Sequence, residues 1–146
     1  MLRHVPPPLW ALLLLGATYL LSEAIALPAL ETRPIGSIVL LVALAIVFTA
    51  MAQFVLANTQ LLPESKRNNA LVTNGLFALT RNPMYLAMVI FCIGGALWME
   101  RSLMLLAPAL MFAVANWVFI PFEEAKMRRQ FGDAFDAYTR RVRRWI

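Results

Sequence analysis

Four stretches of this chain are apolar enough and long enough to cross a lipid bilayer. They are residues 9–27, 35–57, 83–99 and 103–122, and the third is at the short end of the range. A spanning helix needs about 20 apolar residues. The hydrophobic share of 61% also exceeds that of ordinary globular chains. We therefore predict one domain over residues 1–146: an all-α, polytopic membrane protein with four transmembrane helices.

A C-terminal tail follows the last apolar stretch, over residues 123–146. Its apolar residues recur at spacings of three and four, which places them on one face of a helix: Phe131, Phe135, Tyr138, Val142 and Trp145. Arginines occupy the opposite face. A basic amphipathic helix with a terminal Trp is typical of the lipid headgroup layer, and we expect this tail to lie there.

The positive charges predict how the chain is oriented. With four spans, the N-terminus, the connection over residues 58–81 and the tail share one side, which holds 11 of the 13 Lys and Arg residues. Positive charge gathers on the cytoplasmic side. We therefore expect an inner (cytoplasmic) membrane protein of a bacterium, with both termini cytoplasmic. The net charge of +5 is expected to face membrane lipid, because no basic run interleaved with aromatics suggests a nucleic-acid partner.

The polar stretch over residues 69–85 is the main candidate for a functional site. It contains a predicted turn at Thr73-Asn74-Gly75 and then Arg81-Asn82-Pro83 at the start of the third span. The predicted topology brings this corner to the same membrane face as Glu123 and Glu124. A carboxylate pair, an arginine and an aromatic at a cytosolic face suit a zwitterionic cofactor. No Ser-His-Asp set and no Cys/His metal cluster is present, so group transfer by positioning is favoured over hydrolysis or metal catalysis.

Two segments carry a resemblance to a known superfamily. LVTNGLFALTRNPMY, followed by a glycine-bearing span and then PFEEAKMRRQFGDAFDAYTRRVRRW, resembles the isoprenylcysteine carboxyl methyltransferase and phospholipid methyltransferase superfamily of integral membrane enzymes. The likeness covers roughly residues 59–145 and is that of a bacterial-type member. Arg-(Asn or His)-Pro-x-Tyr and the Glu-Glu pair are specific in combination, whereas either motif alone is weak.

The resemblance implies S-adenosylmethionine as the methyl donor and S-adenosylhomocysteine as the product. The donor would bind at the cytosolic side, between the connection before the third span and the tail. Matching the motifs residue by residue places the donor contacts at Asn69, Leu71, Val72, Phe77, Asn82, Pro83, Met84, Tyr85 and Glu123. It also implies catalytic roles for Arg81 and Glu123, with the Glu123 carboxylate pairing with the donor's ammonium group.

The methyl acceptor is expected to be a membrane-associated or amphipathic small molecule. The prenylcysteine enzymes have His where this chain has Asn69 and Asn82, and a substrate-binding Arg where it has Phe119. These departures argue against a prenylcysteine carboxylate and leave a lipid amine, a thiol or another carboxylate open. Phe119 and Asn116 are the candidate substrate residues, although Asn116 could equally hydrogen-bond between helices. A chain this short is compatible with pairing into a homo-oligomer.

Several of these candidate residues also have a non-functional explanation. Arg81 taken alone is an ordinary positive anchor at a membrane surface. Adjacent helical residues point about 100° apart, so Glu123 and Glu124 cannot both face one pocket, and we expect Glu124 to be solvated or paired with Arg128 at i+4. Glu23 is either a functional intramembrane acid or a group at the outer interface. At the level of the whole protein, the alternatives are a non-catalytic lipid-binding scaffold and a sterol-reductase-like enzyme.

Overall fold

The computed structural model describes residues 5–25, 27–58 and 70–146, and over these residues it contains helices and no β-strand. The all-α prediction is therefore confirmed for the described part of the chain. The elements in order are α1 (Pro7–Ala24), α2 (Arg33–Leu56), the 3₁₀ turn η2 (Gly75–Ala78), α3 (Pro83–Met99), the 3₁₀ turn η3 (Ser102–Leu105), α4 (Leu106–Val114), the π-helical turn η4 (Ala115–Phe119), α5 (Ile120–Phe131) and α6 (Asp133–Arg141).

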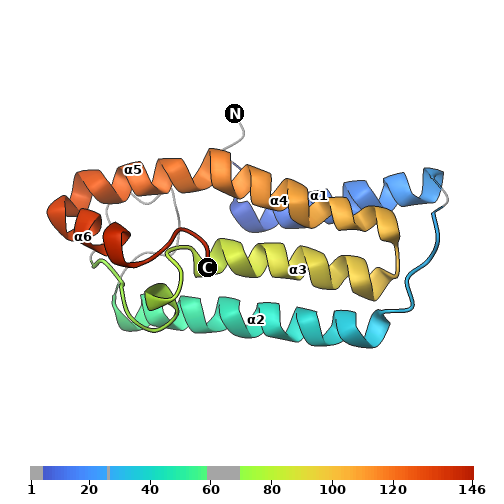
Figure 1. The fold of residues 1–146 in the computed structure, drawn as a ribbon, viewed down its shortest axis with the longest axis horizontal. Coiled ribbons are helices and arrows are strands. Elements are labelled where there is room, and N and C mark those ends of the chain that lie inside the picture. Colours follow the sequence, from blue (N-terminus) through green and yellow to red (C-terminus); the bar gives the residue numbers. More distant parts are fainter. Residues whose placement is uncertain (1–4, 26, 59–69) are drawn as a thin grey trace.

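The helices α1 to α4 form an elongated bundle in which α3 lies between α2 and the α4–α1 layer (Figure 1). Small residues let α2 and α3 pack closely. A methyl group on Gly36 would lie 2.4 Å from the backbone nitrogen of Trp98, and one on Gly94 would lie 2.9 Å from Leu40. Glycine at both positions therefore sets the separation of the two helices, as small residues do between helices in lipid.

The segment from Ser102 to Phe131 is nearly one continuous helix, with the π-turn η4 in the middle. Pro121 explains the interruption, because proline has no N–H to donate and its ring clashes with the preceding turn. The π-turn ends at Phe119, two residues before Pro121, and absorbs that misfit. The helix continues past residue 122, where we predicted the last span to end and the tail to begin. Glu123 and Glu124 accordingly lie on the same helix as the apolar residues before them.

The apolar face of the tail, which we predicted to contact the lipid headgroup layer, packs against the protein itself. After Gly132, which has a left-handed φ of 50°, α6 folds back against the body of the protein at one end of the bundle (Figure 1). Phe135, Tyr138 and Val142 are buried there and pack against Leu71. The apolar face that suggested a headgroup anchor is therefore covered by the protein's own residues.

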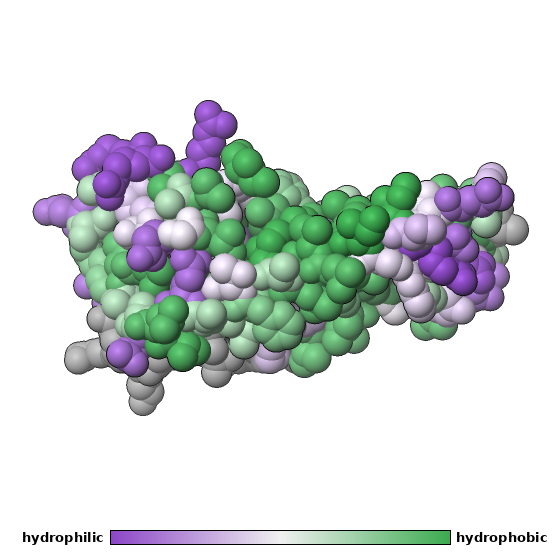
Figure 2. Space-filling view, turned by 90° about the horizontal axis from the view of Figure 1, so that it is seen from below, coloured by the Kyte–Doolittle hydropathy of each residue, from purple (hydrophilic) through white to green (hydrophobic). Residues whose placement is uncertain are grey.

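The surface is divided along the long axis of the molecule. In Figure 2 a hydrophobic surface covers the middle, and hydrophilic residues gather at the two ends. Two helical segments, Arg33–Leu56 and Ser102–Phe131, are long and apolar enough to cross a membrane. The other two predicted spans, α1 and α3, have 18 and 17 residues. Four crossings therefore stay a prediction.

The end of the bundle opposite α6 is held by ion pairs. Glu23 accepts from Arg101 at 2.6 Å, and Glu100 accepts from Arg33 at 3.2 Å. Glu23 is half exposed in this pair, at 50% of its side-chain surface. Glu23 therefore lies at the surface of the described structure as the ion-pair partner of Arg101.

Candidate active site

A cavity of about 630 Å³ lies between the bundle and α6, at the end where the tail folds back. Its wall is mostly apolar, and its charged groups come from the start of α3 and from α5. The predicted donor-contact residues within the described chain all line it: Leu71, Val72, Phe77, Asn82, Pro83, Met84, Tyr85 and Glu123. Asn69 lies outside the described residues. Segments separated by some 40 residues in sequence thus meet around one space.

Glu123 is held in the cavity wall by Tyr85. The Tyr85 hydroxyl donates to Oε1 of Glu123 at 2.6 Å, which connects the first turn of α3 to α5. The apolar residues of the long helix end at Phe122, so Glu123 is the first residue beyond them. Burial raises the pKa of the Glu123 carboxyl to about 7, and the hydrogen bond from Tyr85 partly offsets this rise. We therefore expect this carboxyl to change its protonation state near neutral pH.

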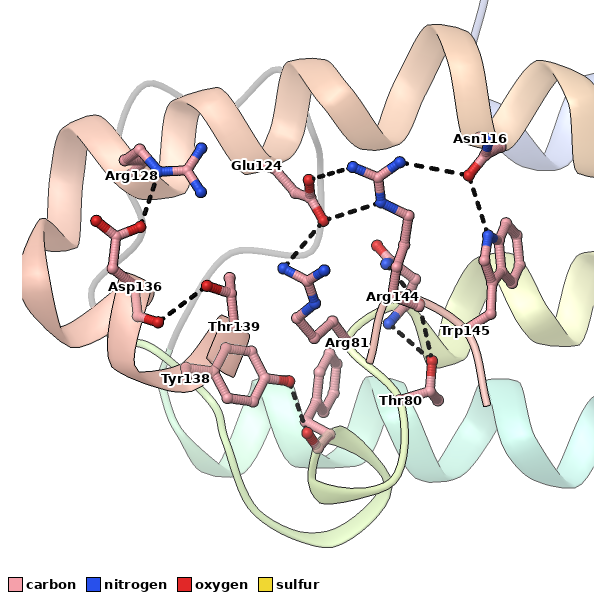
Figure 3. Close-up of polar contacts among 12 residues, drawn as sticks. Thr80, Arg81, Asn116, Glu124, Arg128, Asp136, Tyr138, Thr139, Arg144 and Trp145 are labelled. Carbon is pink, nitrogen blue, oxygen red and sulfur yellow. Dashed lines mark hydrogen bonds and ion pairs between the residues drawn. The ribbon is translucent and has the colours of Figure 1, made fainter. Parts of the chain in front are cut away.

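Glu124 also lines the cavity, so the expectation that the two adjacent glutamates cannot face one pocket is wrong. Its carboxylate nevertheless binds a different set of partners. One carboxylate oxygen lies 3.2 Å from Nη1 of Arg81, and the other lies 2.6 Å from Nη2 of Arg144 (Figure 3). The Glu124 side chain is only 14% exposed. The expectation that it is solvated or paired with Arg128 is wrong, since Arg128 instead binds Asp136 at 2.8 Å.

Arg81 lines the cavity beside Glu123 and Glu124. Its guanidinium group is mostly buried, and its Nε has no hydrogen-bond partner among the described residues. Its backbone N–H donates to the carbonyl of Arg143 at 2.9 Å. The C-terminal segment, as well as the start of α3, therefore fixes the position of Arg81.

The loop over residues 70–78 forms another wall and is fastened to α2 and α6. Gln53 holds the turn with two hydrogen bonds. Its amide donates to the Asn74 carbonyl at 3.0 Å, and its oxygen accepts from Leu76 N–H at 3.2 Å. The Tyr138 hydroxyl donates to the Phe77 carbonyl at 2.6 Å. Burial raises the pKa of Tyr138 to about 12, so this hydroxyl stays protonated as the donor.

Gly75 makes this arrangement sterically possible. Its φ of +57° is a left-handed conformation that favours glycine. A methyl group there would also lie 1.7 Å from Nε2 of Gln53. Sequence reasoning identified the turn but missed Gln53; the one available signal was that Gln53 is the strongly polar residue of an otherwise apolar span.

The two candidate substrate residues lie in different places, although both belong to η4. Phe119 is buried, lines the cavity and stacks on Tyr85 with ring centroids 6.1 Å apart. Asn116 does not line the cavity, and its side-chain oxygen accepts from Arg144 at 3.4 Å and from the Trp145 indole at 3.1 Å. Asn116 therefore binds the end of the chain.

These features define a class: a small helical protein with an apolar surface belt and a mostly apolar cavity whose charged groups lie at one end of the bundle. Residues 32–134 match the family described as phospholipid methyltransferase, and the chain belongs to that family. Family membership and the two long apolar helices indicate a membrane protein.

Two curated proteins are similar to parts of the chain. An uncharacterized protein of Haemophilus influenzae is 33% identical over 63 residues, which are 43% of this chain and all of that protein. The protein-S-isoprenylcysteine O-methyltransferase of Schizosaccharomyces pombe is 32% identical over 84 residues, which are 53% of this chain. The match spans about a third, 34%, of the yeast enzyme's length. No solved structure matches the chain.

Proposed function

We propose that this protein transfers a methyl group from S-adenosylmethionine to an amphipathic acceptor dissolved in the membrane. The observation that carries the proposal is the cavity of about 630 Å³, in which charged groups of both signs are gathered in a mostly apolar wall: Arg81, Glu123, Glu124 and Lys126. A chain of the phospholipid methyltransferase family needs a space that can hold a polar donor and an apolar acceptor at the same time.

The residues that line the cavity suit this donor. Glu123 offers a carboxylate for an ammonium group, and Arg81 offers a guanidinium for a carboxylate, so the two match an amino-acid zwitterion. Phe77 and the segment at Leu71 and Val72 offer an aromatic ring and backbone groups for a purine. S-adenosylmethionine would supply a methyl group already activated by its sulfonium centre.

The protein's own contribution would be alignment and exclusion of water. Tyr85 fixes the orientation of Glu123 through the 2.6 Å hydrogen bond, and Phe119 stacks on Tyr85 to keep that ring in place. Holding donor and acceptor in line can supply a large part of a rate enhancement without an acid or a base. An apolar wall also strengthens the electrostatic contacts inside the cavity by keeping water out.

The apolar part of the cavity suits a lipid-like acceptor. Leu12 of α1, Leu44 and Val47 of α2 and Phe91 of α3 line it, and all four are positioned to contact alkyl groups rather than a headgroup. The names of the family and of the yeast relative both refer to acceptors with a long hydrocarbon part. Phe119 stands where the resemblance would place a carboxylate-binding arginine. We therefore favour a membrane lipid over a prenylcysteine.

The proposed setting is a bacterial cytoplasmic membrane crossed four times, with both termini cytoplasmic. The basic residues support this orientation, because Arg33 and Arg101 alone fall on the other side. The candidate site would then lie at the cytoplasmic face. A soluble donor could enter there while an acceptor arrives from the bilayer.

Methyl transfer can be tested with the purified chain in vesicles of bacterial lipid extract, using S-adenosylmethionine labelled in its methyl group. We expect label to enter the solvent-extractable lipid fraction, and Glu123→Gln to abolish most of that transfer. Heat-denatured protein and protein-free vesicles are the controls. Absence of lipid label above these controls, across several lipid sources, would contradict the lipid acceptor.

A further inference from the structure

The last residues of the chain lie across the start of α3 rather than extending away from the protein (Figure 3). Their backbone carbonyls accept three hydrogen bonds from the corner at residues 80–82. Arg81 N–H donates to the Arg143 carbonyl at 2.9 Å. The Thr80 hydroxyl and the Asn82 amide both donate to the Arg144 carbonyl, at 3.1 Å and 2.9 Å. Thr80 and Asn82 are buried under this contact.

The side chain of Arg144 fastens the same segment to the long helix. It donates to both oxygens of Glu124, at 3.2 Å and 2.6 Å, and to the Asn116 oxygen at 3.4 Å. Such forked arginine–carboxylate pairs are geometrically specific as well as strong. Arg144 therefore connects α5 and η4 through its side chain to the start of α3 through its carbonyl.

Trp145 adds a second attachment to the same asparagine. Its indole N–H donates to the Asn116 oxygen at 3.1 Å, and its ring packs on Phe112 with centroids 4.7 Å apart. The π-turn at Ala115–Phe119 places Asn116 toward these residues and Phe119 toward the cavity. One irregular turn thus supports both the cavity wall and the end of the chain.

We propose that residues 143–145 form a strap that positions Arg81 and Asn82 for ligand binding, with Arg144 as the positioning residue that locks the strap. The inference rests on the proposed function for the nature of the ligand. Arg81 and Arg144 share Glu124, and the Arg81 amide is held by the strap. Release of the strap therefore removes the backbone contact that fixes Arg81 and leaves its guanidinium held by Glu124 alone. Arg144 acts through Arg81 and Asn82 and makes no ligand contact itself.

The test compares Arg144→Ala and Arg144→Lys with the matched control Arg141→Ala, which removes the same charge from an exposed position three residues away. Two quantities are measured on the purified full-length chain in detergent. One is the Kd for S-adenosylhomocysteine by calorimetry. The other is amide hydrogen exchange, without ligand, in peptides covering residues 79–86 and, as an internal reference, residues 38–50 of α2.

Arg144→Ala is expected to raise the Kd by about 10- to 100-fold, the range for losing charge-assisted hydrogen bonds. Exchange should quicken in the 79–86 peptide and stay unchanged in the α2 peptide. Arg144→Lys keeps the charge but cannot donate in parallel to both oxygens of Glu124, so its Kd and exchange rate should lie between those of the wild type and Arg144→Ala. Arg141→Ala should match the wild type in both. A purely structural role would instead quicken exchange in both peptides. Wild-type Kd and exchange in Arg144→Ala would overturn the proposal.

Two further outcomes separate this proposal from the function it rests on. If the wild type binds no S-adenosylhomocysteine but Arg144→Ala still loosens the 79–86 peptide, the donor assignment fails and the strap's hold on the corner stands. If binding weakens without any change in exchange at the corner, the strap proposal fails and the donor assignment stands. Should Arg144→Ala not fold, Trp145→Phe removes the indole donor alone and must loosen the same peptide.

Discussion

The Tyr85 hydroxyl donates a 2.6 Å hydrogen bond to Oε1 of Glu123, which joins α3 to α5 across the wall of the main cavity. Both side chains line that cavity, and they are 38 residues apart in sequence. The hydrogen bond favours the ionised carboxylate, whereas burial favours the neutral acid. The balance leaves a pKa of about 7. The proposed binding of a ligand ammonium at this carboxylate should therefore depend on pH in the physiological range.

Binding of S-adenosylhomocysteine should strengthen as pH rises through about 7, because only ionised Glu123 can pair with an ammonium group. Tyr85→Phe removes a hydrogen bond that lowers the Glu123 pKa, so the midpoint should move upward by about one pH unit. Calorimetric titrations from pH 6 to 8.5 measure this shift. Tyr19→Phe, near Arg101 at the opposite end of the molecule, should leave the midpoint unchanged. A midpoint that falls in Tyr85→Phe would contradict the assignment.

Glu123→Gln and Glu124→Gln should have different effects, the first on ligand affinity alone and the second on both affinity and stability. Glu123→Gln removes the ammonium partner, and we expect the Kd for S-adenosylhomocysteine to rise by about 10- to 100-fold. Its thermal midpoint should not fall, because a buried carboxylate is replaced by a neutral amide. Glu124→Gln leaves Arg81 and Arg144 without their shared carboxylate. It should cost about 1–3 kcal/mol of stability as well as affinity. Equal thermal midpoints for the two variants would argue against these separate roles.

Gly75→Ala should destabilise the loop that carries Phe77. Its left-handed φ and the 1.7 Å approach of Gln53 leave no room for a methyl group, and a strained backbone position costs about 1–3 kcal/mol. Gly16→Ala is the matched control, since nothing lies within 4 Å of the added methyl group and alanine is favoured in a helix. Thermal unfolding in detergent should show a lower midpoint for Gly75→Ala alone. A lower midpoint for Gly16→Ala as well would indicate a general effect of the added methyl.

Helix limits were predictable where local chemistry defines them. A helix was expected at residues 83–99 and is found at Pro83–Met99, because proline starts a helix readily and Glu100 adopts a left-handed conformation that ends it. The last span was expected to end at residue 122, but the helix itself runs on to Phe131, since the change to polar residues at 123 reports the surroundings of the helix and not its end. The helix stops only at Gly132.

The site was predictable as a set of residues but not as a set of contacts. Family resemblance and the positive-inside pattern brought the start of α3 together with Glu123. The partners of Glu124 lie 43 and 20 residues away, at Arg81 and Arg144, and no helical spacing indicates them. The local rule favoured Arg128 at i+4, and the fold satisfied Glu124 with two cations from distant segments instead. The partners of Gln53 and Asn116 were not predictable for the same reason.

Calorimetric titration of the purified wild-type chain with S-adenosylhomocysteine, at pH 7.5 in detergent or in lipid nanodiscs, tests the central claim most directly. The account predicts saturable binding that Glu123→Gln largely abolishes. No heat of binding from correctly folded wild-type protein at millimolar ligand would contradict the donor site, and so would binding that Glu123→Gln leaves intact.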